Sequence, residues 1–405
     1  MGKKAKRAAA AEVESRSSPL LSLSNPAVAE YFGFTPQTTA GVPVSAESSL
    51  GLSSVYRAVS LISGTIATLP LKSYRTHPDD TRERVATFLD NPGGPDGLTQ
   101  FEWTETVLVH LLLWGNAYLL HLYGGAGQLV GLIPLHPSAV TVKKVTNKEE
   151  AERYFPYSKY FTLRMADGTQ EDVTPLDLTH IPAMSHDGLL GLSPILANRQ
   201  AIGTGLAGDK AAARMFANGM MLAGLVTSEE DVDADEAKEI KRGLDAKVAG
   251  ADKVGSLAFV NRTLKFTPWT MPAKDAQFIE SRVHQVEEVA RIFGVPPHLL
   301  GQTEKQTSWG TGVTEQNRGL SRYTLMSWTS RIEQRLSRLL SRPMTCEYDY
   351  AGLLQGSPQE ELAMLIDQVA AGILTVDEAR RIRNLAPLGA ATEETADGSQ
   401  EAVTP

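Results

Sequence analysis

The chain has 405 residues, and its 39 Lys and Arg against 47 Asp and Glu give a formal net charge of −8. Hydrophobic residues make up 42% and charged residues 21%, an ordinary globular balance that excludes a mainly disordered chain, a fibrous chain and a polycation that coats nucleic acid. Cys346 is the single cysteine, which excludes an internal disulfide framework and a cysteine-cluster zinc site. At roughly 150 residues per domain, the length predicts two or three domains or one elongated chain with several lobes.

The two ends differ in composition from the middle. Residues 1–47 are rich in Ala, Ser, Thr and Pro and have little periodicity, so we expect a flexible N-terminal arm. The arm opens with MGKKAKR, a basic stretch interpreted either as a solvated tail or as a weak nucleic-acid contact, and no apolar core long enough for a signal peptide follows it. Residues 389–405 predict a flexible acidic tail.

Residues 48–190 predict an α+β region. Thr99 with Glu102 forms a capping box before an apolar stretch, which indicates a helix start. The run VLVHLLLWGNAYLLHLY (107–123) is interrupted by polar residues and glycine, so it predicts a buried helix leading into a strand rather than a membrane span. Two hairpins are expected, in AYLLHLY-GGAGQ-LVGLIPL and in KYFTLRM-ADG-TQEDV.

Beyond residue 190 the pattern is mostly helical. Ser193-Pro194 predicts a capped helix start, as do Ser357-Pro358 and Thr375 with Glu378. Residues 221–270 interrupt the helices as a small mixed lobe with an acidic helix and expected strands in SLAFV and LKFTPW. The acidic helix is interpreted either as a solvated face or as a face that docks a basic partner.

Two long helices are predicted on either side of a polar loop. The first, 273–293, carries an apolar seam and ends before Gly294 and Pro296-Pro297. The second, 313–342, would span roughly 45 Å and is the one basic element. Its arginines favour a solvated or ion-paired surface over contact with a phosphate backbone. The loop between them, GQTEKQTSWGTG, is expected to be exposed and mobile.

Motifs for catalysis are weak. Gly203-Thr-Gly205-Leu-Ala-Gly208 matches GxGxxG, but it falls inside a helical pattern instead of after a strand, so close helix packing or a flexible point is favoured over a dinucleotide site. Ser185-His186-Asp187 contains triad residue types only as sequence neighbours. Asp177 and His180 with this tripeptide lack a metal-binding spacing. We therefore predict no enzyme activity, no catalytic residues, no cofactor and no metal.

The order of the motifs resembles that of phage portal proteins, of the long-tailed phage family with short portal chains. The motifs are SLGLSSVYRAVSLISGTIATLPLKSYR, WGNAYLL, IPLHPSAV, GLSPI before a helix ending in FANGM, ARIFGVPPHLLG and YTLMSW. Each motif is weak alone, whereas the ordered series over residues 48–388 is specific. The resemblance implies an α+β, mainly helical, elongated fold of wing, stem, clip and crown that forms a ring oligomer.

The resemblance also assigns expected regions to this chain. They are a flexible arm (1–47), the wing (48–190), a first stem helix region (191–220), the clip (221–270), a second stem helix (271–300), the tunnel loop (301–312), the long wing helix (313–350), the crown (351–388) and the acidic tail (389–405).

Candidate functional residues follow from these regions. For DNA proximity in the tunnel loop they are Gln302, Glu304, Lys305, Gln306, Ser308 and Trp309. For stem packing they are Ile279, Val283, Val286, Ala290 and Phe293. For partner docking by the clip they are Glu229, Glu230, Asp231 and Glu236. The alternative for the loop is a disordered interhelical connection with no contact role, and Trp309 could equally pack into a neighbouring subunit.

The implied function is a dodecameric ring at one capsid vertex through which double-stranded DNA is packaged and ejected. The implied partners are DNA, the large terminase, the head–tail connector or adaptor, and the major capsid and scaffolding proteins, with no membrane. The expected location is the virion, and the host cytoplasm during assembly. The alternatives are another phage head structural or connector protein and a nucleotide-binding enzyme supported by GxGxxG alone.

Overall fold

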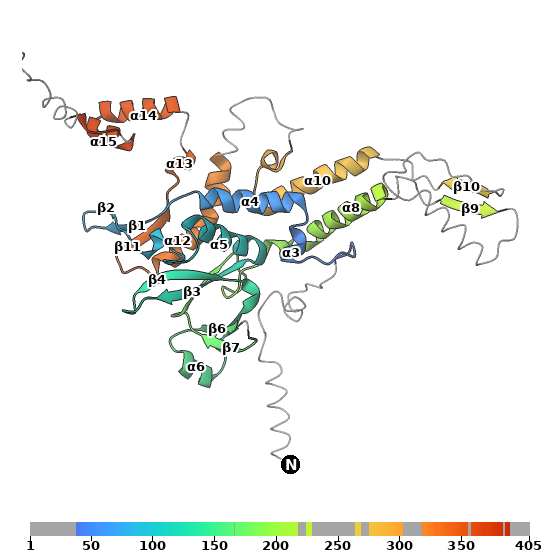
Figure 1. Cartoon of the computed structure of the whole chain (residues 1–405), viewed down its shortest axis with the longest axis horizontal. Coiled ribbons are helices and arrows are strands. Elements are labelled where there is room, and N and C mark those ends of the chain that lie inside the picture. The colour runs from blue at the N-terminus through green and yellow to red at the C-terminus, as the bar shows by residue number, and fades with distance from the viewer. Residues whose placement is uncertain are drawn as a thin grey trace, which may run out of the picture. The chain divides into compact units, whose positions relative to one another are not determined.

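The computed structural model describes residues 38–165, 167–217, 224–228, 264–268, 275–302, 318–354, 358–383 and 385–388. The chain divides into two compact units, Met1–Tyr348 and Asp349–Pro405. In the described ranges the first unit combines helices with small antiparallel sheets, and the second contains helices alone (Figure 1). The α+β, mainly helical fold class is therefore confirmed.

The helices of the first unit include two long pairs and several single turns. They are α3 (Ala46–Ser49), α4 (Ser53–Ala67), η1 (Phe88–Asp90), α5 (Gln100–Trp114), η2 (Pro137–Ala139), α6 (Lys148–Tyr154), α7 (Pro194–Ala197), α8 (Arg199–Ala217), α10 (Asp275–Phe293), η4 (Pro297–Leu300), the π-helix η5 (Leu320–Leu325) and α12 (Met326–Ser337).

The strands of the first unit pair antiparallel throughout the described ranges. The sheet orders are β11-β1-β2, β4-β3-β8, β5-β6-β7 and β10-β9. The strands are β1 (Leu71–Thr76), β2 (Arg82–Arg84), β3 (Asn116–Tyr123), β4 (Leu129–Leu135), β5 (Val140–Lys144), β6 (Lys159–Arg164), β7 (Gln170–Val173), β8 (Leu178–Pro182), β9 (Gly224–Ser228), β10 (Leu264–Pro268) and β11 (Met344–Tyr348).

Helices α4 and α5 pack together at the centre of the first unit (Figure 1). The predicted capping box opens α5, since Glu102 accepts from the Thr99 N–H and Thr99 accepts from the Glu102 N–H. Gly115 ends α5 in the left-handed region at φ 72°, and a Cβ there would lie 2.3 Å from the Leu192 carbonyl oxygen. The chain therefore turns from a buried helix directly into β3, and both predicted hairpins, β3–β4 and β6–β7, are confirmed.

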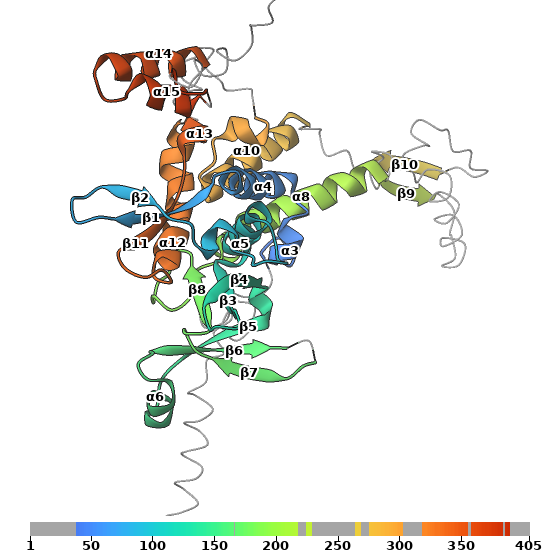
Figure 2. The ribbon, with the colours of Figure 1, turned by 60° about the vertical axis from the view of Figure 1, so that its left-hand side comes forward.

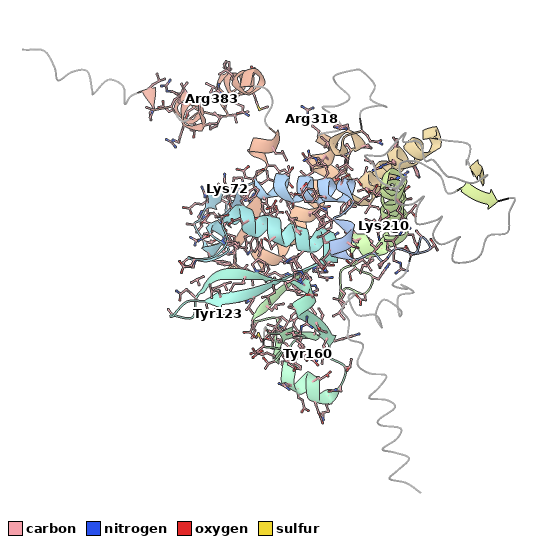
Figure 3. All side chains as sticks on the ribbon, turned by 45° about the vertical axis from the view of Figure 1, so that its right-hand side comes forward. Lys72, Tyr123, Tyr160, Lys210, Arg318 and Arg383 are labelled. Atoms are coloured by element: carbon pink, nitrogen blue, oxygen red, sulfur yellow. The ribbon has the colours of Figure 1, made fainter. Side chains whose placement is uncertain are left out.

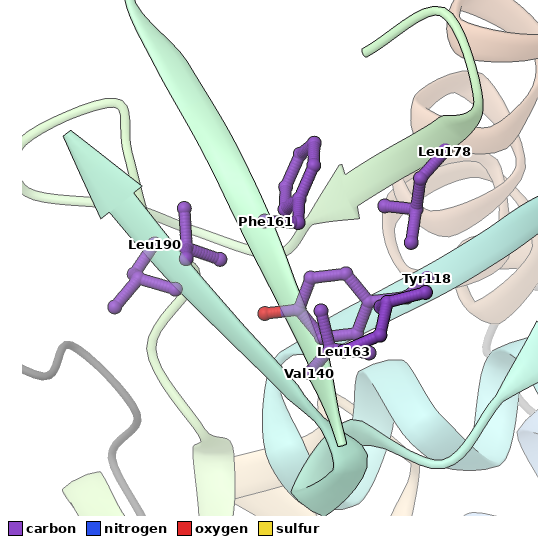
Figure 4. Packing of buried hydrophobic residues seen from close by; sticks show 7 residues of the cluster. Tyr118, Val140, Phe161, Leu163, Leu178 and Leu190 are labelled. Atoms are coloured by element: carbon purple, nitrogen blue, oxygen red, sulfur yellow. The ribbon is translucent and has the colours of Figure 1, made fainter. Parts of the chain in front are cut away.

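The sheets β4-β3-β8 and β5-β6-β7 share a hydrophobic core (Figure 4). Tyr118 from β3 and Phe161 from β6 meet edge to face, with ring centroids 6.2 Å apart. Aromatic pairs in this arrangement add stability beyond the area that they bury. The buried members of the core are Tyr118, Val140, Val142, Phe161, Leu163, Leu178 and Leu190.

A buried polar network ties this core to the segment that leads into α7. The Asn116 amide donates to the Gly191 carbonyl at 2.9 Å, and its Oδ1 accepts from the Gly191 N–H at 2.8 Å. The same Oδ1 lies 2.9 Å from His180 Nε2, while His180 Nδ1 lies 2.9 Å from Lys159 Nζ. Burial holds the pKa of His180 well below its usual value, so the ring is neutral, accepts from the Lys159 ammonium and donates to Asn116.

The helix predicted over 313–342 is shorter in the structure. Its described part passes through the π-helix η5 into α12, which ends at Ser337 rather than Arg342. The Ser337 hydroxyl accepts from the Cys346 N–H at 3.0 Å, and Glu333 accepts from the Tyr348 N–H at 2.9 Å. These contacts hold β11 against α12, and α12 ends near them. A local sequence pattern does not predict such a tertiary contact.

The second unit consists of α13 (Ala351–Leu354), α14 (Pro358–Ala370) and α15 (Val376–Ile382) in its described ranges. The predicted capping box of Thr375 and Glu378 opens α15, and α14 begins at the predicted Pro358. Several large apolar side chains of these helices are more than half exposed, including Met364, Ile366 and Ile382. A helical unit with this much exposed apolar surface is typical of an interaction site.

Candidate functional site

Helices α8 and α10 pack against each other and lead to the strand pair β9–β10 (Figure 2). Gly205 of α8 lies where any Cβ would collide with the Gln285 side chain of α10. One turn further along, Asp209 of α8 pairs with Arg282 of α10 at 3.0 Å. The GxGxxG motif therefore lies within a helix that has no strand before it, and it permits a close helix contact, as the sequence favoured.

The predicted apolar seam of α10 lies partly inside the subunit. Ala290 and Phe293 are buried, whereas Val283 and Val286 are half-buried. The side chain of Ile279 lies outside the described residues. Val289, which the predicted seam omits, is buried as well, because α10 packs against α4 as well as α8. The C-terminal half of the seam therefore contributes to the subunit's own core.

The start of the predicted tunnel loop is bonded to α10, whereas the far end of the loop lies outside the described residues. Gln302 Nε2 donates to the Val283 carbonyl at 2.9 Å. Further along the chain, after residues 303–317, Thr324 of η5 donates to the Gly294 carbonyl at 2.5 Å, and Gly294 follows α10 at φ 66°. Figure 3 labels Arg318, where the described chain resumes. The other predicted loop residues, Glu304, Lys305, Gln306, Ser308 and Trp309, lie outside the described residues.

A cavity of about 310 Å³ lies at the foot of this loop, between α4, α8 and α10. Its lining contains no histidine or cysteine, and its one acid, Asp209, is paired with Arg282. The cavity therefore has no general acid–base pair or nucleophile with an adjacent base. Its lining includes Leu52, Ser53, Ser54, Arg282, Gln285 and Gln302.

The predicted docking acids follow β9. Glu229, Glu230, Asp231 and Glu236 lie outside the described residues, and Ser228, the residue before them, pairs with Leu264 of β10. In the sequence, the acidic segment thus falls between two strands that pair with each other.

The remaining candidates for chemistry have structural partners. Ser185 donates to Asp187 and to the Leu190 carbonyl, and Asp187 accepts from the N–H groups of Leu189 and Leu190, so these side chains shape a turn. Where the structure describes the chain, no three His, Cys, Asp or Glu side chains converge on a possible metal position. The described helices also include none that is long and apolar enough to cross a membrane.

The comparisons with known proteins all indicate the same protein family. The family profile described as phage portal protein matches residues 53–384. The probable portal protein of Streptomyces phage phiC31 is 33% identical over 86% of this chain and 78% of its own length. The portal protein of Enterobacteria phage HK97 is 32% identical over 84% of this chain and 80% of its own.

Solved structures show the same fold at lower identity. An HK97 family phage portal protein from Corynebacterium diphtheriae aligns with a TM-score of 0.56 at 20% identity, covering 76% of this chain and 96% of that one. A chain from the neck of the native gene transfer agent particle, computed with C12 symmetry, aligns with a TM-score of 0.52 at 21% identity, covering 82% and 90%. With the profile match over most of its length, this chain belongs to the phage portal protein family.

Proposed function

We propose that copies of this chain form a dodecameric ring around a channel at one capsid vertex, through which double-stranded DNA is packaged and ejected. Portal proteins are structural components that share this general role. The family match over residues 53–384 carries the proposal. Ring assembly of the purified chain, observed by negative-stain imaging, tests it. Stabilisation by a nucleotide without any ring would instead favour the enzyme alternative.

The proposal assigns the described helices and strands to the regions expected of a portal subunit. Helices α8 and α10 would form the stem, β9 and β10 the root of the clip, and the second unit the crown. The exposed apolar side chains of α14 and α15 support self-association, because a ring gives each copy neighbours on two sides. The proposed location is the capsid vertex of the virion, with assembly in the host cytoplasm beside major capsid and scaffolding proteins.

The loop 301–312 is proposed to face the DNA. Its support is the family match together with the contact of Gln302, at the start of the loop, with the Val283 carbonyl of α10. Deleting residues 303–311 should leave ring assembly intact but impair DNA packaging or retention. A Gly/Ser replacement of equal length separates the loop's side chains from its length, and normal packaging by the deletion variant would refute the assignment.

The acidic segment after β9 is proposed to dock the large terminase or the head–tail adaptor. Reversing the charges of Glu229, Glu230, Asp231 and Glu236 should weaken binding to these partners in a pull-down at low salt, where attraction between charges is screened least. Reversal of Glu149 and Glu152 on α6 provides the surface-charge control. Unchanged binding by the first variant would reject this docking face.

A further inference from the structure

One side of α12 carries cations that have no ion-pair partner among the described residues. Arg331, Arg335 and Arg338 recur at intervals of four and three residues, so they share one stripe of the helix. The adjoining stripe, about a third of a turn away, contains Ile332 and Leu336 and is buried in the subunit. The exposure of the arginine stripe therefore varies along the helix: Arg338 is exposed, whereas Arg331 and Arg335 are half-buried.

The charges of this stripe lack acidic partners in the described part of the chain. Arg335 and Arg338 make no hydrogen bond or ion pair there, although Arg335 is half-buried. Lys159 is close enough to Arg335 for its pKa to be lowered to about 8, first by burial and then by that guanidinium. The Lys159 ammonium contacts the neutral His180 ring rather than a carboxylate.

One acid acts on these cations without forming an ion pair. Asp187 accepts hydrogen bonds from Ser185 and from two backbone N–H groups, and its charge raises the pKa of Lys159, so this single carboxylate offsets part of the positive charge beside it. The half-buried guanidinium of Arg335 loses part of its hydration, which a carboxylate partner would offset. No described residue supplies the remaining counter-charge, and a neighbouring copy is a source that a ring would bring close.

A surface of complementary chemistry lies at the start of α5. Phe101 is 42% exposed, and Glu102 and Glu105 follow on neighbouring turns of the same helix face. Glu105 makes no hydrogen bond or ion pair with any described residue, and it does not reach Arg335 of its own subunit. A ring joins two different patches of each copy, so patches that cannot meet within a subunit can meet between neighbours.

We propose that a cationic face, formed by Arg331, Arg335 and Arg338 of the α12 stripe with Lys159 of β6, contacts the acidic start of α5 (Phe101, Glu102 and Glu105) of the neighbouring copy in the ring. This inference rests on the proposed ring. Complementary charges at such a contact would fix which patches meet and favour a single register around the ring.

The test is a charge swap within one chain. Arg335→Glu should lower the ring fraction at least tenfold at a fixed concentration in mass photometry, because it places like charges across the contact. The subunit itself should keep or gain thermal stability, because the introduced carboxylate lies beside Lys159 and Arg338. Adding Glu105→Arg should restore the ring. Arg164→Glu, at an exposed position on β6, is the matched control and should leave assembly unchanged.

The outcomes separate the inference from the proposed function. A ring unaffected by Arg335→Glu, or a loss that Glu105→Arg does not restore, overturns the pairing while the wild-type ring stands. Loss of the ring on removal of residues 389–405 alone would make the acidic tail the occupant and also overturn it. If the wild-type chain forms no ring, the proposed function itself fails.

Discussion

Replacing Asn116 should destabilise the first unit more than any single surface change. Its amide donates to the Gly191 carbonyl at 2.9 Å and the Trp114 carbonyl at 3.1 Å, and its Oδ1 accepts from the Gly191 N–H and from His180. Asn116→Ala leaves these buried groups without partners. At about 1–3 kcal/mol for each unsatisfied group, with partial relaxation, the expected loss is about 3–5 kcal/mol.

Urea unfolding followed by tryptophan fluorescence measures this loss, because Trp114 lies two residues away. Asn116→Asp is the informative second variant, since it keeps the shape but places a carboxylate oxygen against the Gly191 and Trp114 carbonyls. It should destabilise too, and less so at low pH, where a protonated carboxyl can donate. A loss under 1 kcal/mol for Asn116→Ala would refute the account of this network.

Two further predictions concern the packing of Gly205 and the protonation of His110. Gly205→Leu should destabilise the α8–α10 pair by a few kcal/mol, whereas Gly208→Leu, with nothing within 4 Å of its Cβ, should be neutral or slightly stabilising; equal effects in thermal unfolding would contradict the packing role of Gly205. Burial and then His136 lower the pKa of His110 to about 4, so between pH 4 and 6.5 the unfolded chain binds the extra proton and stability rises with pH. The His110 contribution that is lost between pH 7 and pH 5 is about 2 kcal/mol, so His110→Gln should reduce the pH dependence of the unfolding free energy by that amount, while the part due to buried His180 remains. An unchanged pH dependence would contradict this prediction.

Much of the fold could be predicted from local sequence signals. The capping box at Thr99 and the glycine at 115 placed α5 and β3, because both features act on the backbone within a few residues. The end of α12 was missed, because the Ser337–Cys346 contact that sets it joins a helix to a strand. The network of Asn116 and His180 was missed for a similar reason, since its members are 64 residues apart in sequence.

The sequence predicted the family of the protein, but it did not predict which candidate residues are buried or paired. The ordered motifs predicted the portal family, which the comparisons confirm. The seam of α10 could not separate residues buried by α4, such as Phe293, from those left half-buried, such as Val283, because the pattern does not say which neighbour covers each turn. The sequence also did not show that Arg335 has no ion-pair partner among the described residues, because that depends on which acids fold near it.

The proposed function requires these subunits to work as a closed ring around a channel. Electron microscopy of the purified chain, together with its mass measured at several concentrations, decides whether they do. Rings of a single rotational symmetry with a central opening are expected. A monomer at every concentration would rule the proposed function out.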